Sequence, residues 1–277
     1  MMPQIPPRIF IYVALPCEAK PLTEHFNLKK NTAVQPFAVY FNKDIYLTVT
    51  GLGKSAMAAG VAYTQALFGA TLYPVLVNVG IAGHKDYAVG DLFLVDKITD
   101  FDSQKSYYPP LVFTPPCPTA CIQTVSRLQP AYDLHRLCDM EASAFYETAL
   151  RFSSGELIHC LKVVSDNELA PAENIQPKQV ALLIAAHIVA IETLLAELSR
   201  LAKLITAPES KLFEPLVQGY HFTSSEQGQL KKQLSRWAAL TQASESDMNP
   251  FDEKPFHKGK DVLCWLDQQI SGIEFFL

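Results

Sequence analysis

The sequence predicts an α/β fold in which helices cover both faces of a sheet. Between residues 8 and 205, short runs of strand length alternate with segments of helical periodicity. Most of these runs are apolar at nearly every position, which is typical of strands buried on both faces. Glycine-rich turns follow several of the runs, and ligands of such sheets gather at the carboxyl ends of the strands. A binding site is therefore expected at that edge of the sheet.

The strands expected from β-branched and aromatic runs are 8–15, 37–41, 45–50, 75–79, 91–98, 120–125 and 157–164. The polar turn at 42–44 predicts that the second and third of these form a hairpin. The helices expected from their periodicity are 56–68, 142–152 and one long helix, 176–205. Between 100 and 130 the pattern weakens around two proline pairs.

The character of the chain changes beyond residue 206. Segments 227–241 and 260–270 have helical patterns and are joined by a polar, proline-containing stretch at 244–258. This part has neither a strand signal nor a cluster of residues suited to catalysis. We expect a catalytic domain over 1–205 and, over 206–277, a helical extension packed on it.

The composition indicates a well-buried globular protein. Of the 277 residues, 49% are hydrophobic and 18% are charged, which argues against disorder. The net charge of −5, without any basic run, argues against a nucleic-acid partner. Residues 1–8 lack the apolar region of a signal peptide, and the most apolar stretch, 180–195, is shorter than a bilayer span. A cytoplasmic protein without a membrane partner is expected.

The six cysteines are scattered without the spacing of a disulfide framework. Cys117 and Cys121 are spaced as metal ligands could be, but no second pair of ligands follows them. Reduced structural thiols are therefore expected, and no metal site is predicted.

Two phosphate-binding motifs begin near residue 51 and are incomplete. Residues 53–55 end like a P-loop, but Thr48 stands where that loop requires glycine. Residues 51–53 begin like a dinucleotide fingerprint, but Ala56 replaces its last glycine and no acidic residue closes the pattern. The glycines indicate a tight turn or a close approach of the backbone to a ligand.

Three acidic side chains stand where strands end or a helix begins. Glu18 follows the first strand, Glu141 precedes the helix 142–152, and Asp166 follows the strand 157–164. Together they could meet at one edge of the sheet. Three carboxylates around one pocket suit cleavage of a glycosidic bond, because one can activate water, one can hold sugar hydroxyls and one can protonate the leaving group. Taken singly, each is equally well a helix cap or a surface acid.

Five short stretches, taken in order, resemble the nucleoside phosphorylase superfamily and, within it, the 5′-methylthioadenosine/S-adenosylhomocysteine nucleosidases. They are 14–18 (ALPCE), 50–54 (TGLGK), 78–83 with 89–91 (NVGIAG and VGD), 139–142 (DMEA) and 163–166 (VVSD). The resemblance extends over about residues 8–200. It implies a three-layer α/β/α domain with a central, twisted mixed sheet, and a homo-oligomer, expected to be a dimer.

The resemblance also implies roles for individual residues. Glu18 corresponds to the base that activates the attacking water. Asp166 corresponds to the acid that protonates the purine at N7, with Ser165 beside it orienting the base. Met140 and Glu141 correspond to the ribose contacts, with Glu141 binding the sugar hydroxyls. No metal or organic cofactor is implied.

Other binding residues follow from the same comparison. Gly83 lies in the expected glycine-rich turn. Lys162 stands where the nucleosidases carry arginine, so this position keeps its positive charge but lacks the planar guanidinium group. The segment between Asp100 and Cys138, which supplies the purine-stacking aromatic in the family, is shorter here. Tyr107, Tyr108 and Phe113 are possible substitutes for that aromatic residue, although they could equally be exposed loop residues. Arg127 could lie near the base.

Two further functions stay open on the sequence. A phosphorylase, with phosphate as co-substrate, needs cations around the phosphate, and Lys54 and Lys162 are the ones available. The 15–22 turn has no arginine, and Glu18 would repel phosphate, so hydrolysis is favoured. The second is a non-catalytic nucleoside-binding protein, which would have no need of Glu18 and Asp166 together. We expect hydrolysis of a purine (thio)nucleoside such as methylthioadenosine or S-adenosylhomocysteine.

Overall fold

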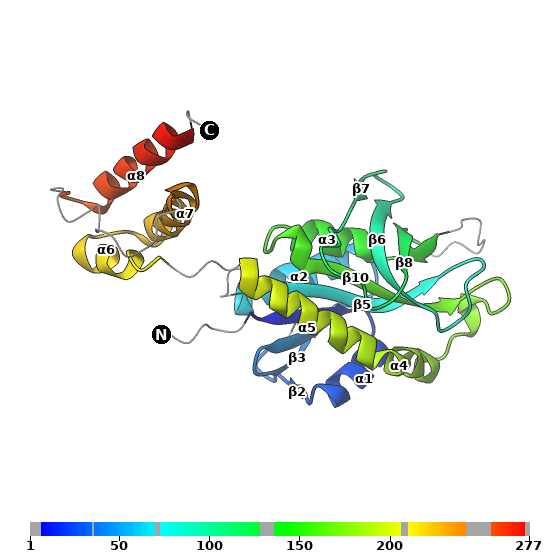
Figure 1. Ribbon diagram of the computed structural model, residues 1–277. Coiled ribbons are helices and arrows are strands. Elements are labelled where there is room, and N and C mark those ends of the chain that lie inside the picture. The colour runs from blue at the N-terminus through cyan, green and yellow to red at the C-terminus, as the bar shows by residue number, and fades with distance from the viewer. Residues whose placement is uncertain are drawn as a thin grey trace. The chain divides into compact units, whose positions relative to one another are not determined.

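The computed structural model describes residues 7–34, 36–69, 73–127, 136–205, 210–241 and 256–274. The chain divides into two compact units, residues 1–206 and 207–277. Each unit has hydrophobic core residues of its own. Figure 1 labels the helices and strands along the chain.

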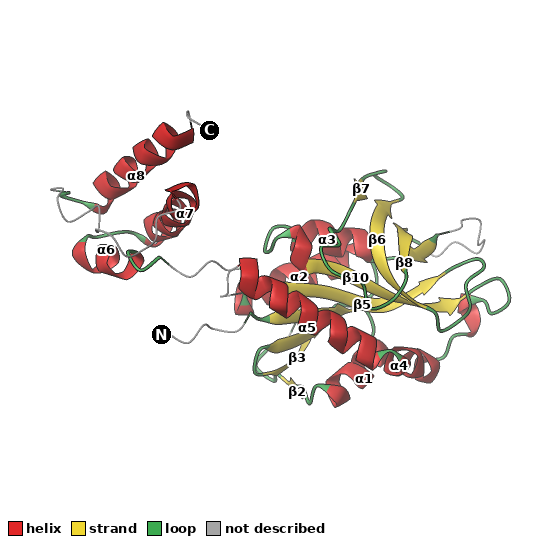
Figure 2. Cartoon of the chain, viewed as in Figure 1, coloured by secondary structure: helices red, strands yellow, loops and turns green. Residues whose placement is uncertain are grey.

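The first unit is built on one ten-stranded mixed sheet with helices on both faces (Figure 2). Its strands are β1 (Ile9–Val13), β2 (Lys29–Lys30), β3 (Ala38–Asn42), β4 (Ile45–Val49), β5 (Val75–Gly83), β6 (Leu92–Asp100), β7 (Ser106–Tyr107), β8 (Thr119–Thr124), β9 (Leu137–Asp139) and β10 (Ile158–Asp166). The order is β10-β6-β8-β9-β5-β1-β4-β3-β2, and β7 pairs with β6. Because β10 also pairs with β5, the strands β5, β10, β6, β8 and β9 close into a ring.

The helices of this unit are α1 (Pro16–His25), α2 (Lys54–Phe68), α3 (Ala142–Ala149), α4 (Pro177–Ala186) and α5 (Ile188–Ile205), with short 3₁₀ turns at Gly155–Leu157 and Ala172–Asn174. Alternation along the strands sends successive side chains to opposite faces. Ile11 and Val13 of β1 join the core beneath α1, α4 and α5, whereas Phe10 and Tyr12 join the core beneath α2 and α3. The expected three-layer α/β/α architecture with a mixed sheet is therefore confirmed.

Most predicted strands of the first unit are present. The expected hairpin is formed by β3 and β4, whose antiparallel register joins Asn42 to Ile45. Lys43, in the turn between them, has a φ of +51°. The expected strands at 75–79 and 157–164 are present and run further, to Gly83 and Asp166. The glycine-rich segment 80–83, expected as a turn, is therefore the end of β5, and Asp166 ends β10.

The single helix expected over 176–205 is wrong. The structure has two helices, α4 and α5, bent by 57° where His187 separates them. His187 ends α4 with φ −112° and ψ 15°, and its Nε2 lies 2.7 Å from the carbonyl oxygen of Gly90. The apolar periodicity continues across the bend, so that the sequence pattern could not reveal this tertiary contact.

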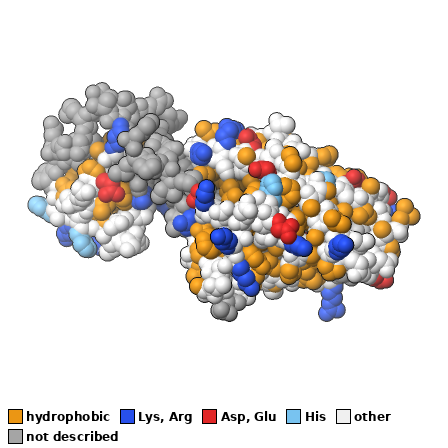
Figure 3. Space-filling model, turned by 90° about the horizontal axis from the view of Figure 1, so that it is seen from below, with side chains coloured by type: hydrophobic (Ala, Val, Ile, Leu, Met, Phe, Trp, Pro, Cys, Tyr) orange, Lys and Arg blue, Asp and Glu red, His pale blue; other side chains and the backbone are white. Residues whose placement is uncertain are grey.

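Neither α4 nor α5, nor any other single helix in the described ranges, is long and apolar enough to cross a bilayer. The two together reach that length and composition only as a bent pair. On the face of the first unit drawn in Figure 3, apolar side chains are interspersed with lysines, arginines and acidic residues. All six cysteines are free thiols.

The second unit consists, in its described part, of α6 (Phe213–Gly219), α7 (Ser224–Thr241) and α8 (Gly259–Glu274). The expected helices at 227–241 and 260–270 are present, and α6 was not expected. Thr223 and Glu226 form a capping box at the start of α7, in which each side chain accepts the other's backbone N–H. A core of apolar residues joins the three helices, among them Leu216, Leu230 and Leu266. That this extension packs on the first unit stays a prediction.

Candidate active site

Glu18 lies in the first turn of α1, directly after β1. Its Oε2 accepts hydrogen bonds from the backbone N–H groups of Ala14 and Leu15, at 2.9 and 2.8 Å. Its Oε1 accepts one from Ile81 of β5, at 3.1 Å. The residue is 2% exposed, and this burial raises its pKa although the backbone donors and the charge of Lys162 oppose the rise. Glu18 is thus a fixed, buried carboxyl group whose affinity for a proton is increased.

Lys162 lies in the middle of β10, beside Gly80 of β5 in the parallel register. Its Nζ forms an ion pair with Asp139 Oδ2 at 2.8 Å. A Cβ atom built on Gly80 would lie 3.1 Å from Glu18 Oε1 and 3.3 Å from Lys162 Nζ. Glu18 and Lys162 therefore face the same small space over Gly80, and the absence of a side chain there keeps that space open.

The charge of Lys162 is stabilised by its acidic neighbours. Burial opposes the charged form, but Asp139 and Glu141 outweigh it and raise the pKa of Lys162 above its usual range. These neighbours therefore favour the charged ammonium form of Lys162.

The β9–α3 junction supplies the next two carboxyl groups. Asp139 ends β9, and its Oδ2 accepts the N–H of Ala142, the first residue of α3, at 2.8 Å. Glu141 is the N-cap residue of that helix, and its Oε1 accepts the N–H of Gly53 at 2.7 Å. Burial, and then the charge of Asp139, raise the pKa of Glu141 to about 7. The charges of Lys162 and Glu18 also act on Glu141, which places all four groups in one cluster.

Asp166 and Ser165 lie at the carboxyl end of β10. In the sheet, Asp166 pairs with Gly83 of β5, and Gly83 also pairs with Cys138 of β9. The Ser165 hydroxyl donates to Asp166 Oδ1, and the Asp166 carbonyl accepts the N–H of His84 at 3.0 Å. Burial raises the pKa of the Cys138 thiol to about 12, and the charges of Asp139 and Asp166 contribute. Asp166 thus lies at the same edge of the sheet as Asp139.

The structure brings the predicted residues to one edge of the sheet. Glu18 and Lys162 face the space over Gly80, and both of their charges act on Glu141. Met140, between Asp139 and Glu141 in the chain, is half-buried. The other predicted residues lie at the ends of β5 and β10, namely Gly83, Ser165 and Asp166. The catalytic and binding roles given to these residues stay predictions.

The three aromatic residues considered for purine stacking lie in different surroundings. Phe113 packs edge-on against His159, with ring centroids 5.2 Å apart, and His159 lies at the opposite end of β10 from Asp166. Tyr107 packs against Tyr146 of α3, and Tyr108 is 65% exposed. Phe113 therefore lies away from the Asp166 end of β10.

Arg127 is exposed, just before the undescribed residues 128–135. An aromatic group that the sequence did not indicate lies beside Asp166. His84 stacks on Tyr87 with centroids 3.7 Å apart, and Tyr87 stacks on Phe93 at 4.4 Å. Asn167, the residue after Asp166, donates its side-chain amide to the Tyr87 carbonyl at 2.9 Å. The loop after β5 is thereby tied to the end of β10.

Lys54 is paired with two acidic residues other than Glu18, Asp139 and Glu141. Its Nζ lies 2.7 Å from Asp100 Oδ2 and 2.6 Å from Asp102 Oδ2. Burial lowers the pKa of Lys54, but the hydrogen bonds to Asp100 and Asp102 outweigh burial and raise it. Burial raises the pKa of Asp100, but its hydrogen bonds, the one from Lys54 among them, hold that pKa well below its usual range. Lys54 thus starts α2 as an ion-paired residue.

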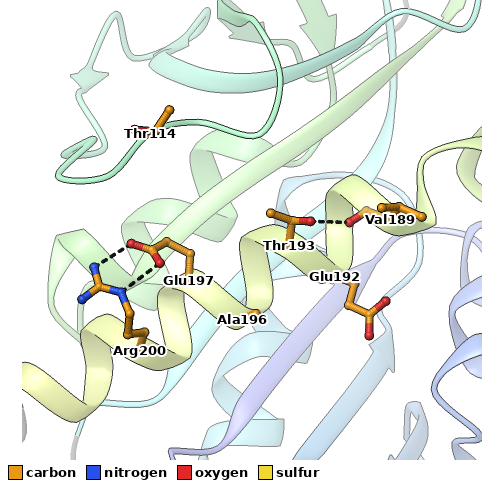
Figure 4. Close-up of a pocket in the computed structure, with 7 residues that line it drawn as sticks. All are labelled: Thr114, Val189, Glu192, Thr193, Ala196, Glu197 and Arg200. Carbon is orange, nitrogen blue, oxygen red and sulfur yellow. Dashed lines mark hydrogen bonds and ion pairs between the residues drawn. The ribbon is translucent and has the colours of Figure 1, made fainter.

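No group of His, Cys, Asp or Glu side chains suited to hold a metal occurs within the described ranges. A hollow of about 700 Å³ lies over the outer side of α5 (Figure 4). Its lining residues are Thr114, Val189, Glu192, Thr193, Ala196, Glu197 and Arg200. Glu197 and Arg200 form a two-pronged ion pair with each other. This hollow contains none of the predicted site residues.

Residues 8–136 match the family model of the phosphorylase superfamily. The match includes Glu18, Gly53 and the end of β5, from Gly80 to Gly83. The resemblance to the nucleoside phosphorylase superfamily, first indicated by short motifs, is thereby confirmed. No curated protein matches the chain.

Solved structures share the fold of the first unit. The 5′-methylthioadenosine nucleosidase of Arabidopsis thaliana has a TM-score of 0.56 and 18% identity, over 70% of this chain and 97% of that one. The Helicobacter pylori 5′-methylthioadenosine/S-adenosylhomocysteine nucleosidase with butyl-thio-DADMe-Immucillin-A has a TM-score of 0.58 and 14% identity, over 70% and 100%. The H. pylori futalosine hydrolase has a TM-score of 0.57 and 15% identity, over 69% and 98%. At these identities the likeness establishes the fold.

Proposed function

We propose that the chain is a nucleosidase that hydrolyses the N-glycosidic bond of a purine nucleoside or thionucleoside. The observation that carries this proposal is the space over Gly80, which the Glu18 carboxyl group and the Lys162 ammonium both face. A water molecule there would meet a base with a raised pKa on one side and a fixed cation on the other. Glu141, in the same cluster, is available to the sugar hydroxyls.

Each group has a part in the proposed reaction. Glu18 takes a proton from the attacking water as the new bond to the sugar carbon forms. Asp166 gives a proton to the purine N7, so that the base leaves as a neutral molecule. Positive charge grows on the ribose ring between these events, and the carboxylates of Glu18 and Glu141 stabilise it. The products are the free base and the free sugar.

The remaining predicted residues bind the substrate in this proposal. Met140 contacts the ribose together with Glu141. Gly83 and Ser165 lie beside Asp166, where the base would be held. No metal or organic cofactor takes part. The homo-oligomer, expected to be a dimer, and the cytoplasmic location stay predictions.

The ion pairs of the two lysines favour water over phosphate as the attacking group. A phosphorylase must surround a phosphate with donors and cations. Lys162 is paired with Asp139, and Lys54 with Asp100 and Asp102. A phosphate near Glu18 would meet carboxylates rather than unpaired cations, and this repulsion disfavours it.

Known proteins of similar fold support the substrate class. Two of the solved structures are nucleosidases for methylthioadenosine, and another is a futalosine hydrolase. We therefore propose a purine nucleoside with a 5′ substituent, such as methylthioadenosine or S-adenosylhomocysteine, as the substrate.

The test is the release of free base from methylthioadenosine, S-adenosylhomocysteine, adenosine and inosine, each with and without phosphate. Release without phosphate is expected. Release that requires phosphate would make the protein a phosphorylase, and saturable binding without release would make it a nucleoside-binding protein. Either of these results would overturn the proposal.

Asp166→Asn tests the acid directly. Asparagine has a similar size but no proton to give, so base release should fall by about 10²- to 10⁴-fold. Substrate binding, measured by calorimetry, should be largely spared. A variant with a near-wild-type rate would contradict the role of Asp166.

A further inference from the structure

Asp139 differs from the other carboxyl groups of the cluster because donors surround it completely. Its Oδ1 accepts the Thr124 hydroxyl at 2.8 Å. Its Oδ2 accepts the Ala142 N–H at 2.8 Å and the Lys162 ammonium at 2.8 Å. The side chain has no exposed surface. Asp139 is therefore closed to a substrate, and any part that it plays must act through its neighbours.

Those neighbours form a continuous network around the start of α3. Thr124 Oγ1, which donates to Asp139, accepts the N–H of Ser143 at 3.0 Å. The Ser143 hydroxyl donates to Asp100 Oδ2 at 2.7 Å, and Asp100 binds Lys54. Each member is a fixed donor or acceptor, so the network leaves Asp139 a single position.

Lys162 needs such an anchor more than an arginine would. Its ammonium is a point charge on a flexible four-carbon stem, whereas the arginine fork is planar and held by several bonds at once. The ion pair with Asp139 fixes where the Nζ atom lies, at the space over Gly80 that Glu18 also faces.

We propose that Asp139 is the positioning residue of this site. It holds the Lys162 ammonium opposite Glu18, and it holds the first turn of α3, from which Glu141 extends. This inference deepens the proposed function and rests on it for the part of Glu18 as the base. Asp139 itself does not touch the substrate or the reacting atoms.

The charge environment of Glu18 provides the readout. Among the described residues, the ionisable groups with a charge interaction with Glu18 are Lys162 from β10, Glu141 at the start of α3 and Cys17 on its own helix. Of these, Lys162 lowers the pKa of Glu18. If Asp139 no longer holds Lys162 in place, Glu18 loses that cation and its pKa must rise.

The experiment compares Asp139→Asn with the wild-type full-length chain. The titration of Glu18 is followed by ¹³C NMR of glutamate labelled at the side-chain carboxyl, and the signal is assigned by its loss in Glu18→Gln. The midpoint should move up by about 1 pH unit in Asp139→Asn. The acidic limb of kcat/KM should move in the same direction. We expect kcat to fall about 100-fold, with a much smaller change in KM.

Two further variants keep the test decisive if Asp139→Asn folds poorly. Thr124→Val keeps the shape of the side chain but removes one hydrogen bond to Asp139, so it should move the Glu18 midpoint in the same direction by less. Ser143→Ala is the matched control. It removes the bond to Asp100 from the same turn of α3 but leaves Asp139 its three donors, so the midpoint should not move.

The outcomes separate this inference from the proposed function. An unmoved Glu18 midpoint in folded Asp139→Asn, or in Thr124→Val if the first does not fold, would overturn the positioning role even if stability falls. A wild-type protein that releases no base from any nucleoside would instead overturn the proposed function. The NMR titration needs no turnover, and it decides the position of Lys162 in either case.

Discussion

At the scale of single residues, the cluster contains more buried carboxyl groups than buried cationic groups. Among the described residues that meet there, Glu18, Asp139 and Glu141 surround one ammonium, Lys162. Full ionisation of all three carboxyl groups would leave negative charge without a partner in a buried place, which is costly. Burial raises the pKa values of both Glu18 and Glu141, and the charge of Asp139 adds to the rise of Glu141. Asp139 accepts hydrogen bonds from three donors, one of which is the Lys162 ammonium.

Glu141→Gln should make the protein more stable at alkaline pH. The pKa of Glu141 is about 7 in the folded chain against 4.5 when unperturbed. The folded state therefore binds more protons than the unfolded state between these values, and Glu141 costs stability as pH rises through them. Glutamine can still accept the Gly53 N–H. Urea unfolding should show the advantage of the variant over wild type growing by about 2 kcal/mol between pH 5 and pH 8. A difference independent of pH would contradict this account.

Gly80→Ala should reduce turnover more than stability. The added methyl group would lie 3.1 Å from Glu18 Oε1 and 3.3 Å from Lys162 Nζ, in the space proposed for the attacking water. We expect kcat to fall about 100-fold, because small displacements of reacting groups have effects of that size. Gly228→Ala in α7, where a Cβ meets nothing within 4 Å, is the matched control. Equal activity of the two variants would show that the space over Gly80 is not used.

The sequence predicted the site in part, and for identifiable reasons. Glu18, Glu141 and Asp166 stand at the ends of recognisable strands or at a helix start, where motifs and sheet topology indicate a shared edge. The importance of Asp139 depends on Lys162 and Thr124, and no pattern in the sequence shows that these side chains meet. The sequence left the stacking aromatic open, because a loop residue such as Phe113 has no periodicity that fixes its direction.

At the scale of elements, length decided what could be predicted. Long apolar strands such as β5 and β10 were expected, whereas β9 has three residues and lies within an acidic stretch, too short for a periodic signal. Yet β9 pairs with both β5 and β8 and carries Asp139 into the cluster. The bend between α4 and α5 was missed because the apolar pattern does not distinguish one long helix from two bent ones.

His187→Ala should weaken the α4–α5 bend. The variant loses the bond from Nε2 to the Gly90 carbonyl, which is partly buried, so unfolding in urea should show a loss of about 1 kcal/mol. His25→Ala serves as the control. It removes an exposed contact with Glu192, worth a few tenths of a kcal/mol at most, and an edge-on contact with the neighbouring Phe26 ring. Losses of equal size in the two variants would contradict the structural importance of the His187 contact.

At the scale of the whole molecule, the two units have separate cores. The first unit contains the sheet, whereas the described part of the second is helical. The first unit carries every residue of the predicted site, as well as the match to the phosphorylase superfamily. Both tryptophans of the chain, Trp237 and Trp265, lie in the second unit. Tryptophan emission therefore reports on the second unit alone.

Leu266→Ala should destabilise the second unit by about 2–5 kcal/mol. Leu266 is fully buried in the core that joins α6, α7 and α8, and its truncation leaves a cavity there. The urea midpoint of tryptophan emission should fall accordingly. Leu182→Ala, an exposed position on α4, should leave that midpoint unchanged. An unchanged midpoint in Leu266→Ala would contradict the placement of this residue at the centre of the core.

The hydrolytic use of the buried cluster is tested most directly by the rate of base release from methylthioadenosine in phosphate-free buffer, for the wild type and for Glu18→Gln. The wild type should release adenine together with the free sugar, at a rate that added phosphate does not increase. Glu18→Gln, which keeps the shape of the side chain but cannot take a proton from water, should be slower by about 10²- to 10⁴-fold. Equal rates for the two proteins, or a wild type that works only when phosphate is added, would contradict the proposed mechanism.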